Sequence, residues 1–585
     1  MTSAGRARFG IGSERDAWAA SLESPSEIRE AHDVGDVLPV VEWAEAEALA
    51  GRWAVLLLSY EAAPAFDDAL RTREAASVLP LAWAAAYDQA ADVCWLAPEA
   101  MQDPPVVDWR PAIDEARFTR DIASVIDHIR AGDTYQVNYT FPLTGRLAAD
   151  PWDWFDACAR EAAVPYAACI DTGDAVVVSL SPELFLERTG AHVRMRPMKG
   201  TARRGRWPDE DARLASELTV SEKARAENLM IVDLLRNDIG RVAATGSVTA
   251  RDLCRLERYP TVWQLTSAVE AVLPASTSLG DLLRATFPCG SVTGAPKVST
   301  MQIIAGLEDA ARGLYTGAIA LIRPGGDVVS SVAIRTAVVD RRSGVATFGV
   351  GAGITADSRA AEEWAECLAK ARVVRQPAVP DDARLFETMR LADGVIVRRD
   401  RHVARMLASA ALFGWDADGA RVEAALDALT RRHPAGVWRA RVWLDRRGGV
   451  ETAADPFEAD PRPWRVALAT APVDTRSPLL FNKTTRRDVY DAARAGAPAG
   501  LDDLLLWNTR RELTEATRAS VVVEIDGERV TPPVACGLLP GTMREELLAS
   551  GAVRERIVRM DDLPRASGLW LVNSLRGWID VTLEA

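Results

Sequence analysis

The chain has 585 residues, too many for one ordinary hydrophobic core, so we expect two or three domains. Its net charge is −14, from 69 Lys and Arg against 83 Asp and Glu, which argues against a nucleic-acid-binding surface. We find no long apolar run, no apolar signal segment and no CxxC pair among seven scattered cysteines, which predicts a cytoplasmic protein with free thiols and no membrane span.

The first elements that can be placed lie between residues 118 and 141. Apolar residues recur at helical spacing from Phe118 to Ile129 and predict a helix that Gly132-Asp133 ends. Residues 135–141 alternate strictly, which predicts a half-buried strand with Gln136 on its amide-rich second face.

Two later segments are helical and carry glutamates. Residues 221–242 read as a helix with an apolar middle that contains Glu227. Residues 360–374 read as a second helix, on which Glu363, Glu366 and Lys370 share one face. Carboxylates from two helices either form surface ion pairs or meet to hold Mg²⁺, which prefers oxygen ligands.

A break rich in proline separates two regions of different texture. Residues 376–383 predict a linker between a domain of residues 1–375 and a smaller domain of residues 384–585. The one dense basic stretch, residues 194–206, lies in the first region. On an acidic protein it indicates a solvated loop or the lining of a site for a small anion.

Long motifs in the first region resemble the chorismate-utilising enzymes, the family of anthranilate, aminodeoxychorismate and isochorismate synthases. They are SPELF (181–185), PMKGT (197–201), AENLMIVDLLRNDIGRV (226–242), GSVTGAPK (290–297), LYTGAI (314–319) and GAGITADS (351–358). The resemblance implies an α/β fold of two layers with large β-sheets. The second region is expected to be a smaller α/β domain.

The same resemblance implies a set of site residues. Glu227 and Glu366 match ligands of Mg²⁺, which would neutralise the ring carboxylate of chorismate. Glu183 matches the general acid and base. Groups expected to contact the substrate are Gln136, Gln264, Ser291, Tyr315, Arg335, Gly351, Gly353 and Lys370.

Two positions indicate which reaction of the family to expect. Isochorismate-type enzymes carry a lysine that activates water where this chain has Gln136, which disfavours hydroxylation. Lys199 in PMKGT resembles the lysine of aminodeoxychorismate synthases, where anthranilate synthases have alanine. By that resemblance Lys199 attacks C2 of the ring and Glu183 protonates the departing C4 hydroxyl. Burial and nearby cations such as Arg203 would keep the lysine partly neutral.

The chain departs from the family at two positions. Gln264 replaces a histidine and cannot transfer protons, which places anthranilate-type elimination of pyruvate in doubt. Ala224 replaces an acidic residue near Glu227 and predicts a weaker outer shell of the magnesium site. Neither Cys289 nor Cys536 lies in a glutaminase turn, so we expect ammonia from a separate glutamine amidotransferase. Residues 21–24 (SLES) resemble the LLES element of tryptophan-inhibited anthranilate synthases or match it by chance.

The second region resembles fold-type IV enzymes that use pyridoxal 5′-phosphate (PLP). The motifs are LFETMRLADG (385–394), RHVARM (401–406), FNKTT (481–485), LTEAT (513–517) and LPGTMRE (539–545). By this resemblance Lys483 binds PLP covalently and Glu515 pairs with its pyridine nitrogen. The implied phosphate-binding groups are Arg405, Gly541, Thr542 and Ser574. The usual opening R-G-x-x-Y-G-D-G is missing.

The two resemblances together imply consecutive reactions of folate biosynthesis. Chorismate would be aminated to 4-amino-4-deoxychorismate, and a lyase would then release pyruvate and 4-aminobenzoate. One alternative is an anthranilate synthase component I with an aminotransferase-like tail, against which Lys199 and Gln264 both argue. In another, the C-terminal domain only binds partners or stabilises the first.

Overall fold

The computed structural model describes residues 4–12, 18–74, 77–92, 107–162, 164–259, 262–371, 379–380 and 382–584. The predicted linker lies partly outside these residues, and Cys94 lies wholly outside them. The chain forms two compact units, one of residues 1–203 and 215–376 and the other of residues 204–214 and 377–585. Within the described ranges, no helix is both long and apolar enough to cross a membrane. The six cysteines located in the structure are free and buried.

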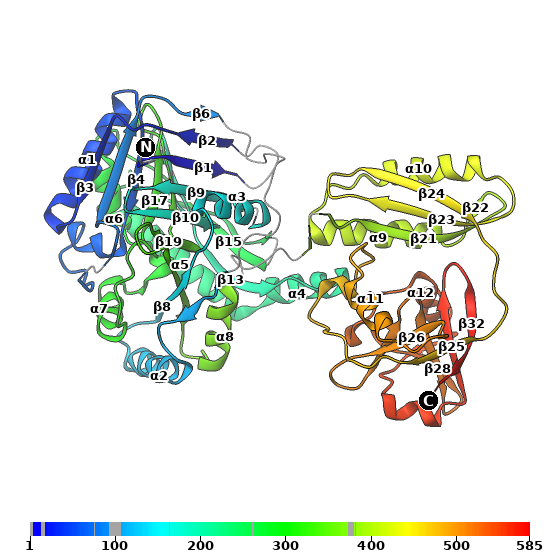
Figure 1. Ribbon diagram of the computed structural model, residues 1–585. Helices are drawn as coiled ribbons and strands as arrows, with labels where there is room; N and C mark the ends of the chain where they lie inside the picture. The colour runs from blue at the N-terminus through cyan, green and yellow to red at the C-terminus, as the bar shows by residue number, and fades with distance from the viewer. Residues whose placement is uncertain are drawn as a thin grey trace. The chain divides into compact units, whose positions relative to one another are not determined.

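The first unit is built on two ten-stranded sheets (Figure 1). One has the order β16 (Gly294–Ala295), β8 (Gln136–Arg146), β20 (Val345–Ile354), β19 (Thr336–Asp340), β10 (Ala175–Ser181), β9 (Tyr166–Asp171), β1 (Ala7–Ile11), β2 (Trp18–Leu22) and β6 (Ala91–Asp92), with β7 (Arg110–Pro111) beside β8. The other has the order β13 (Met198–Arg203), β15 (Val262–Val272), β12 (His192–Arg196), β11 (Leu184–Thr189), β18 (Val328–Val332), β17 (Ala318–Ile322), β4 (Trp53–Leu58), β5 (Ala82–Tyr87) and β3 (Glu27–Ala31), with β14 (Thr249–Arg258) beside β15.

The central strands of each sheet are buried on both faces. Along β4, Leu56 packs into a core cluster shared with helices, whereas Leu57 packs into a cluster shared with the other sheet. Successive strand residues point to opposite faces, so a run such as WAVLLL serves two cores at once. The helices are α1 (Val34–Leu49), α2 (Glu115–Ala131), α3 (Pro151–Ala162), α5 (Glu222–Gly240), α6 (Leu279–Thr286), α7 (Lys297–Leu307) and α8 (Ala360–Lys370). The expected fold of paired large sheets is therefore confirmed.

The predicted local elements form, with one correction. Helix α2 ends at Gly132, which has φ 85° and caps the helix in the left-handed region. Strand β8 forms as expected, but the prediction that it is half-buried is wrong. Gln136 on its amide-rich face is 1% exposed, because that face lies inside the molecule rather than towards solvent. Tyr135 precedes the strand and is 68% exposed.

The second unit contains two sheets and the start of α4 (Pro208–Val220). A four-stranded sheet has the order β22 (Val395–Ile396), β21 (Leu385–Ala392), β23 (Val437–Leu444) and β24 (Val450–Pro456), and packs with α9 (Arg399–Phe413) and α10 (Gly419–Arg432). An eight-stranded sheet has the order β27 (Leu513–Ala516), β26 (Asp503–Trp507), β25 (Trp464–Leu468), β32 (Gly577–Leu583), β31 (Gly568–Asn573), β28 (Ser520–Ile525), β29 (Glu528–Thr531) and β30 (Arg554–Glu555), with α11 (Asp488–Ala495) and α12 (Thr542–Ala549).

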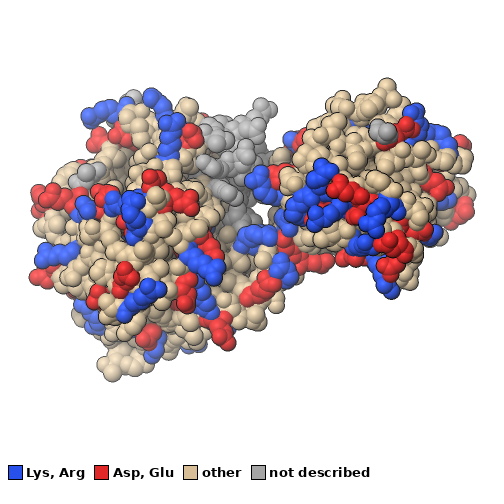
Figure 2. Space-filling model, turned by 90° about the horizontal axis from the view of Figure 1, so that it is seen from below, with Lys and Arg blue, Asp and Glu red and all other residues tan. Residues whose placement is uncertain are grey.

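Charged side chains of both signs are interspersed over the face of the molecule in Figure 2. Many of them form exposed ion pairs, such as Arg462 with Asp502 at 2.6 Å. Such pairs contribute little to stability individually. The charges that matter for chemistry are the buried ones.

Candidate active sites

The strand that carries Lys199 is irregular at that residue. The register between β13 and β15 shifts around Lys199 and Gly200, which marks a bulge. Gly200 has φ 86°, and a Cβ atom there would lie 3.0 Å from that of Ala224. Asn228 on α5, fully buried, donates from Nδ2 to the Lys199 carbonyl at 3.3 Å. The bulge, the small Ala224 and this hydrogen bond together fix the backbone of the lysine.

Lys199 lies among several charged groups. Burial lowers its pKa from the ordinary value, and the nearby Lys370 lowers it further. The carboxylates of Glu183, Glu227 and Glu366 act in the opposite direction but do not outweigh burial. A lysine in this environment is neutral more often than one in water, as a nucleophile must be.

Glu183 follows β10 and is 4% exposed. Ser291 donates from Oγ to Glu183 Oε1 at 2.6 Å. Burial raises the pKa of Glu183 to about 7, although the hydrogen bond from Ser291 and the charge of Lys199 both favour the carboxylate. Around neutral pH this side chain can therefore both donate and accept a proton.

Gln136 and Gly353 lie next to the lysine. A Cβ atom at Gly353 would collide with the Gln136 amide nitrogen and lie 3.2 Å from Lys199 Nζ. Gln136 Oε1 is buried without a hydrogen-bond partner in the described part of the chain. A buried, unpaired amide oxygen costs free energy, so this oxygen is available to a bound donor. A Cβ atom at Gly351 would crowd the Tyr139 carbonyl, at 2.6 Å.

Gln264 on β15 lies opposite Thr201 on β13, and Thr201 is two residues after Lys199. Thr201 donates from Oγ1 to Gln264 Oε1 at 2.8 Å. This bond leaves the Gln264 amide NH₂ group as a donor. Gln264, which replaces the histidine of other family members, thus has its side-chain amide held in place beside β13, the strand of Lys199.

Arg335 lies close enough to Tyr315 for the tyrosine to influence its pKa. Arg335 has φ 50°, a left-handed conformation uncommon outside glycine. Burial lowers the pKa of its guanidinium to about 10. Among the described residues, no carboxylate pairs with this guanidinium. A largely buried guanidinium without a protein anion is able to pair with a carboxylate of a ligand.

Burial is the main cause that raises the pKa of Glu227 on α5, and Glu366 on α8 is close enough to raise it further. Lys370 pairs with Glu366 at 2.9 Å and donates to the Gly351 carbonyl at 2.8 Å. Within the described ranges, no group of three or more His, Cys, Asp or Glu side chains could hold a metal. Two carboxylates nevertheless suffice for Mg²⁺, which commonly completes its shell with water and substrate oxygens. The donor chemistry of the pair fits the ion, which would have to displace Lys370 from Glu366.

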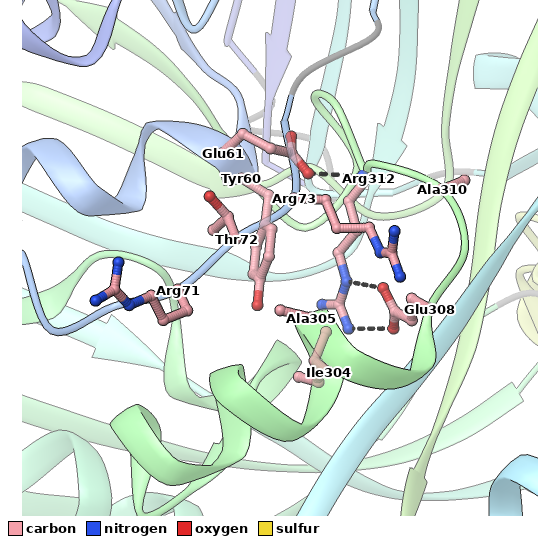
Figure 3. Close-up of a pocket in the computed structure, with 10 residues that line it drawn as sticks. All are labelled: Tyr60, Glu61, Arg71, Thr72, Arg73, Ile304, Ala305, Glu308, Ala310 and Arg312. Atoms are coloured by element: carbon pink, nitrogen blue, oxygen red, sulfur yellow. Dashed lines mark hydrogen bonds and ion pairs between the residues drawn. The ribbon is translucent and has the colours of Figure 1, made fainter.

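A small cavity of about 10 Å³ is lined in part by Tyr60, Glu308 and Arg312 (Figure 3). Arg312 pairs with Glu308 at 2.6 Å and donates to the Val292 carbonyl at 3.0 Å, next to Ser291. Its backbone nitrogen donates to Glu61 at 2.7 Å. The cavity has room for one water-sized molecule. The surrounding network braces the loop that carries Ser291.

In the second unit, Lys483 follows a buried asparagine and lies over the Phe386 ring, with Nζ 4.7 Å from its centroid. Burial lowers the pKa of Lys483 to about 8, and the charge of Arg405 lowers it further. Because the amine is easily deprotonated, it can form an imine with an aldehyde and later serve as a base.

Glu515 on β27 is 5% exposed and accepts hydrogen bonds from the Tyr490 hydroxyl at 2.7 Å and the Leu539 amide at 3.3 Å. Burial nevertheless raises its pKa to about 7. Its protein neighbours therefore leave the carboxylate under-compensated. A protonated pyridine nitrogen would supply the missing positive partner.

Two of the expected phosphate-binding groups, Ser574 and Thr542, contact His402. Its ring nitrogens contact Ser574 Oγ at 2.8 Å, Thr542 Oγ1 at 3.1 Å and Glu387 at 2.7 Å. Arg405 also pairs with Glu387, at 2.6 Å. Burial opposes the charged form of Glu387, but Arg405 and His402 outweigh it and hold its pKa at about 2. Thr542 begins α12 after Gly541, so backbone amides of a helix N-terminus adjoin the hydroxyl groups. This donor set fits a phosphate.

Comparison with known families agrees with this geometry. Residues 4–376 match the family model of chorismate binding enzymes, and the chain belongs to that family. Residues 384–583 match the model of class IV amino-transferases.

The relatives that match the chain include both aminodeoxychorismate synthases and anthranilate synthases. The aminodeoxychorismate synthase of Streptomyces griseus is 44% identical over 298 residues, which cover 50% of this chain and 40% of that protein. An anthranilate synthase component 1 of Haloarcula marismortui is 40% identical over 284 residues, covering 47% and 58%. The chain thus spans about half the length of the curated relatives it matches. The crystal structure of anthranilate synthase component I from Streptococcus pneumoniae superposes with a TM-score of 0.54 at 24% identity, over 62% of this chain and 94% of that one.

The structure also places residues that sequence reasoning missed. Asn228, Glu387 and Tyr490 each contact a predicted site residue or its backbone. Asn228 lies in the motif of residues 226–242 and Glu387 in the motif of residues 385–394. Only the folded structure shows that both are buried next to predicted site residues. Tyr490 lies in no motif, and no pattern in the sequence distinguishes it.

Proposed function

We propose that the chain aminates chorismate at C4 and then converts 4-amino-4-deoxychorismate to 4-aminobenzoate and pyruvate. The observation that carries the first step is a partly buried lysine of lowered pKa, Lys199, beside Glu183, whose pKa is about 7. Relatives named aminodeoxychorismate synthase support this choice. The name anthranilate synthase among equally similar relatives makes 2-amination the competing outcome.

In the proposed amination, each residue has a defined task. Arg335 and Tyr315 hold the enolpyruvyl carboxylate of chorismate, and Glu227 and Glu366 would hold Mg²⁺, which neutralises the ring carboxylate. Lys199 Nζ forms a bond to C2 while the C4–O bond breaks, and Glu183 transfers its proton to the departing hydroxyl group. Ammonia then forms a bond to C4, and the C2–N bond to Lys199 breaks. Gln136, which cannot remove a proton from water, leaves ammonia as the nucleophile.

In the proposed second reaction, the second unit holds PLP through the groups that fit it. Lys483 would hold PLP through its aldehyde carbon, Glu515 would pair with the pyridine nitrogen, and Ser574, Thr542 and Arg405 would hold the phosphate. When bound, PLP supplies an electron sink. The Lys483 amine would take the proton from C4 of the substrate, and the electron pair of that C–H bond would join the ring π system as the C3–O bond breaks. The enolpyruvyl oxygen would leave with the pair of the C3–O bond and take up a proton, which gives an aromatic ring and pyruvate.

The nitrogen source is proposed to be a separate glutamine amidotransferase, and the compartment is proposed to be the cytoplasm. The curated relatives named component 1 support a partner subunit. Six buried free thiols agree with a reducing compartment.

Product analysis tests the proposal. The purified chain is incubated with chorismate, Mg²⁺, PLP and ammonium salt, and the aminobenzoates are separated by chromatography. We expect 4-aminobenzoate and pyruvate in equal amounts, and no product when glutamine replaces ammonium. Predominant 2-aminobenzoate would replace the proposal with anthranilate synthesis, and glutamine-dependent turnover would contradict the need for a partner.

A further inference from the structure

A short segment from the middle of the chorismate-binding sequence belongs to the second compact unit. Residues 204–214 cluster with residues 377–585, although they begin directly after β13, the strand of Lys199. We call residues 204–211 the hook segment. Its first residues, 204–206, end the basic stretch of residues 194–206, but no motif of either family resemblance covers the hook segment.

The hook segment is internally braced. Arg204 and Asp211 form a buried ion pair at 2.7 Å, and Asp211 Oδ1 also accepts from the Gly205 amide at 2.7 Å. Glu210 accepts from the Arg206 amide at 2.7 Å. A Cβ atom at Gly205 would collide with the backbone of Asp211, so the turn requires glycine. The segment thus presents Arg206 and Trp207 in a fixed geometry.

These two residues contact the segment just before Lys483. The Arg206 carbonyl accepts a hydrogen bond from Asn482 Nδ2 at 2.9 Å. Trp207 stacks on Phe481 with 4.9 Å between ring centroids and 22° between ring planes. The Arg206 guanidinium lies 4.9 Å from the Phe481 centroid and donates to the Thr475 carbonyl at 2.9 Å. Stacked rings and a cation over a ring each add free energy beyond the area buried.

Asn482 links the hook segment to the lysine. It is 2% exposed, and its side chain also donates to the Pro478 carbonyl at 2.9 Å and accepts from Ser409 Oγ at 2.8 Å. On the other side of the chain, the Lys483 carbonyl accepts from the Phe386 amide at 3.0 Å. The backbone of Lys483 is therefore held between β21 and the hook segment.

The same contacts extend to the second group expected at the cofactor. Trp207 packs on a core cluster that contains Phe481 and Tyr490. Tyr490 donates its hydroxyl hydrogen to Glu515 at 2.7 Å. A loss of packing at Trp207 would thus loosen the supports of both Lys483 and Glu515.

We infer that Arg206 and Trp207 are positioning residues for Lys483, acting through Asn482 and Phe481. A short piece of the chorismate-binding sequence thereby completes the PLP site of the second unit. This inference rests on the proposed binding of PLP by that unit. It makes the lyase site depend on a segment joined directly to the strand of Lys199.

The test measures PLP binding by the full chain, using the visible absorbance of lysine-bound PLP. Trp207→Leu keeps an apolar side chain but removes the ring stack. We expect an apparent Kd for PLP about tenfold higher, equivalent to about 1.4 kcal/mol. We also expect a shift in the midpoint of the pH titration of the absorbance of lysine-bound PLP. Trp207→Phe retains a ring and should recover most of the affinity. Arg206→Gln, which removes the cation over Phe481, should weaken binding in the same direction.

Trp438→Leu is the matched control, because Trp438 is a partly buried tryptophan of the same unit that packs on a different core cluster. Chorismate consumption by each variant checks that the chain is folded. Parent-like Kd and midpoint in Trp207→Leu and Arg206→Gln would overturn the inference, as would equal weakening by Trp438→Leu. Absence of lysine-bound PLP in the parent would instead remove the proposed lyase function, and the inference with it.

Discussion

The protonation of Glu183 offers a quantitative test of the amination site. The reactive form needs a protonated Glu183, present below pH about 7, and a neutral Lys199, favoured as the pH rises. The profile of kcat/KM for chorismate against pH reports groups of the free enzyme. We therefore expect the plot of log kcat/KM against pH to change slope near pH 7. We assign this change of slope, called the break below, to Glu183, whichever of the two groups ionises first.

Ser291→Ala should move that break upward. The hydrogen bond from Ser291 Oγ at 2.6 Å stabilises the carboxylate, so its loss raises the pKa of Glu183. A hydrogen bond to a charged group contributes about 1.5–3 kcal/mol, and one pKa unit corresponds to about 1.4 kcal/mol. The expected shift is therefore about 1–2 pH units upward. Because Ser291 is also a predicted substrate contact, the position of the break is diagnostic and the height of the profile is not.

The assay follows chorismate loss while total ammonium is adjusted to keep free ammonia constant across the pH series. Ser181→Ala is the matched control. Ser181 Oγ contacts the Val332 carbonyl at 2.6 Å and the Glu183 backbone amide at 3.3 Å, but not the carboxyl group. It should leave the break where the parent has it. A break that stays in place or moves down in Ser291→Ala would refute the assignment of Glu183 as the titrating acid.

Three further substitutions test other parts of the two sites. Lys199→Ala should slow 4-amination by about 100-fold or more, since removal of a nucleophile leaves only a direct route; unchanged 4-aminated product by chromatography would contradict its role. Arg335→Gln should raise KM for chorismate about 10–100-fold through loss of a charge-assisted hydrogen bond, and a parent-like KM would exclude a carboxylate contact. Lys483→Ala should remove the visible absorbance of bound PLP and the 4-aminobenzoate product while chorismate consumption continues, and 4-aminobenzoate at the parent's rate would end the lyase assignment.

Local patterns predicted the elements around the site well where one physical signal dominated. Helix α2 ends at Gly132 because the left-handed cap favours glycine. The spacing of its apolar residues correctly predicted which face of the helix is buried. The exposure of β8 was predicted wrongly, since alternation of polar and apolar residues normally indicates one solvated face. Here the amide face of β8 is turned towards Lys199 and Gly353, and no pattern within one strand can distinguish solvent from a site.

Burial, which no motif encodes, decides the chemistry of the two lysines. Motifs single out Lys199 and Lys483 as residue types that could be nucleophiles, but a surface lysine of the same sequence would be protonated at neutral pH. In the structure, burial is the largest cause that lowers the pKa of both, while the acids near them, Glu183 and Glu515, are raised to about 7. Each proposed active site thus combines an amine whose pKa burial lowers with a carboxyl group whose pKa burial raises. That pairing depends on strands and helices distant in the sequence, including Trp207 in the second unit, and so it appears only once the chain is folded.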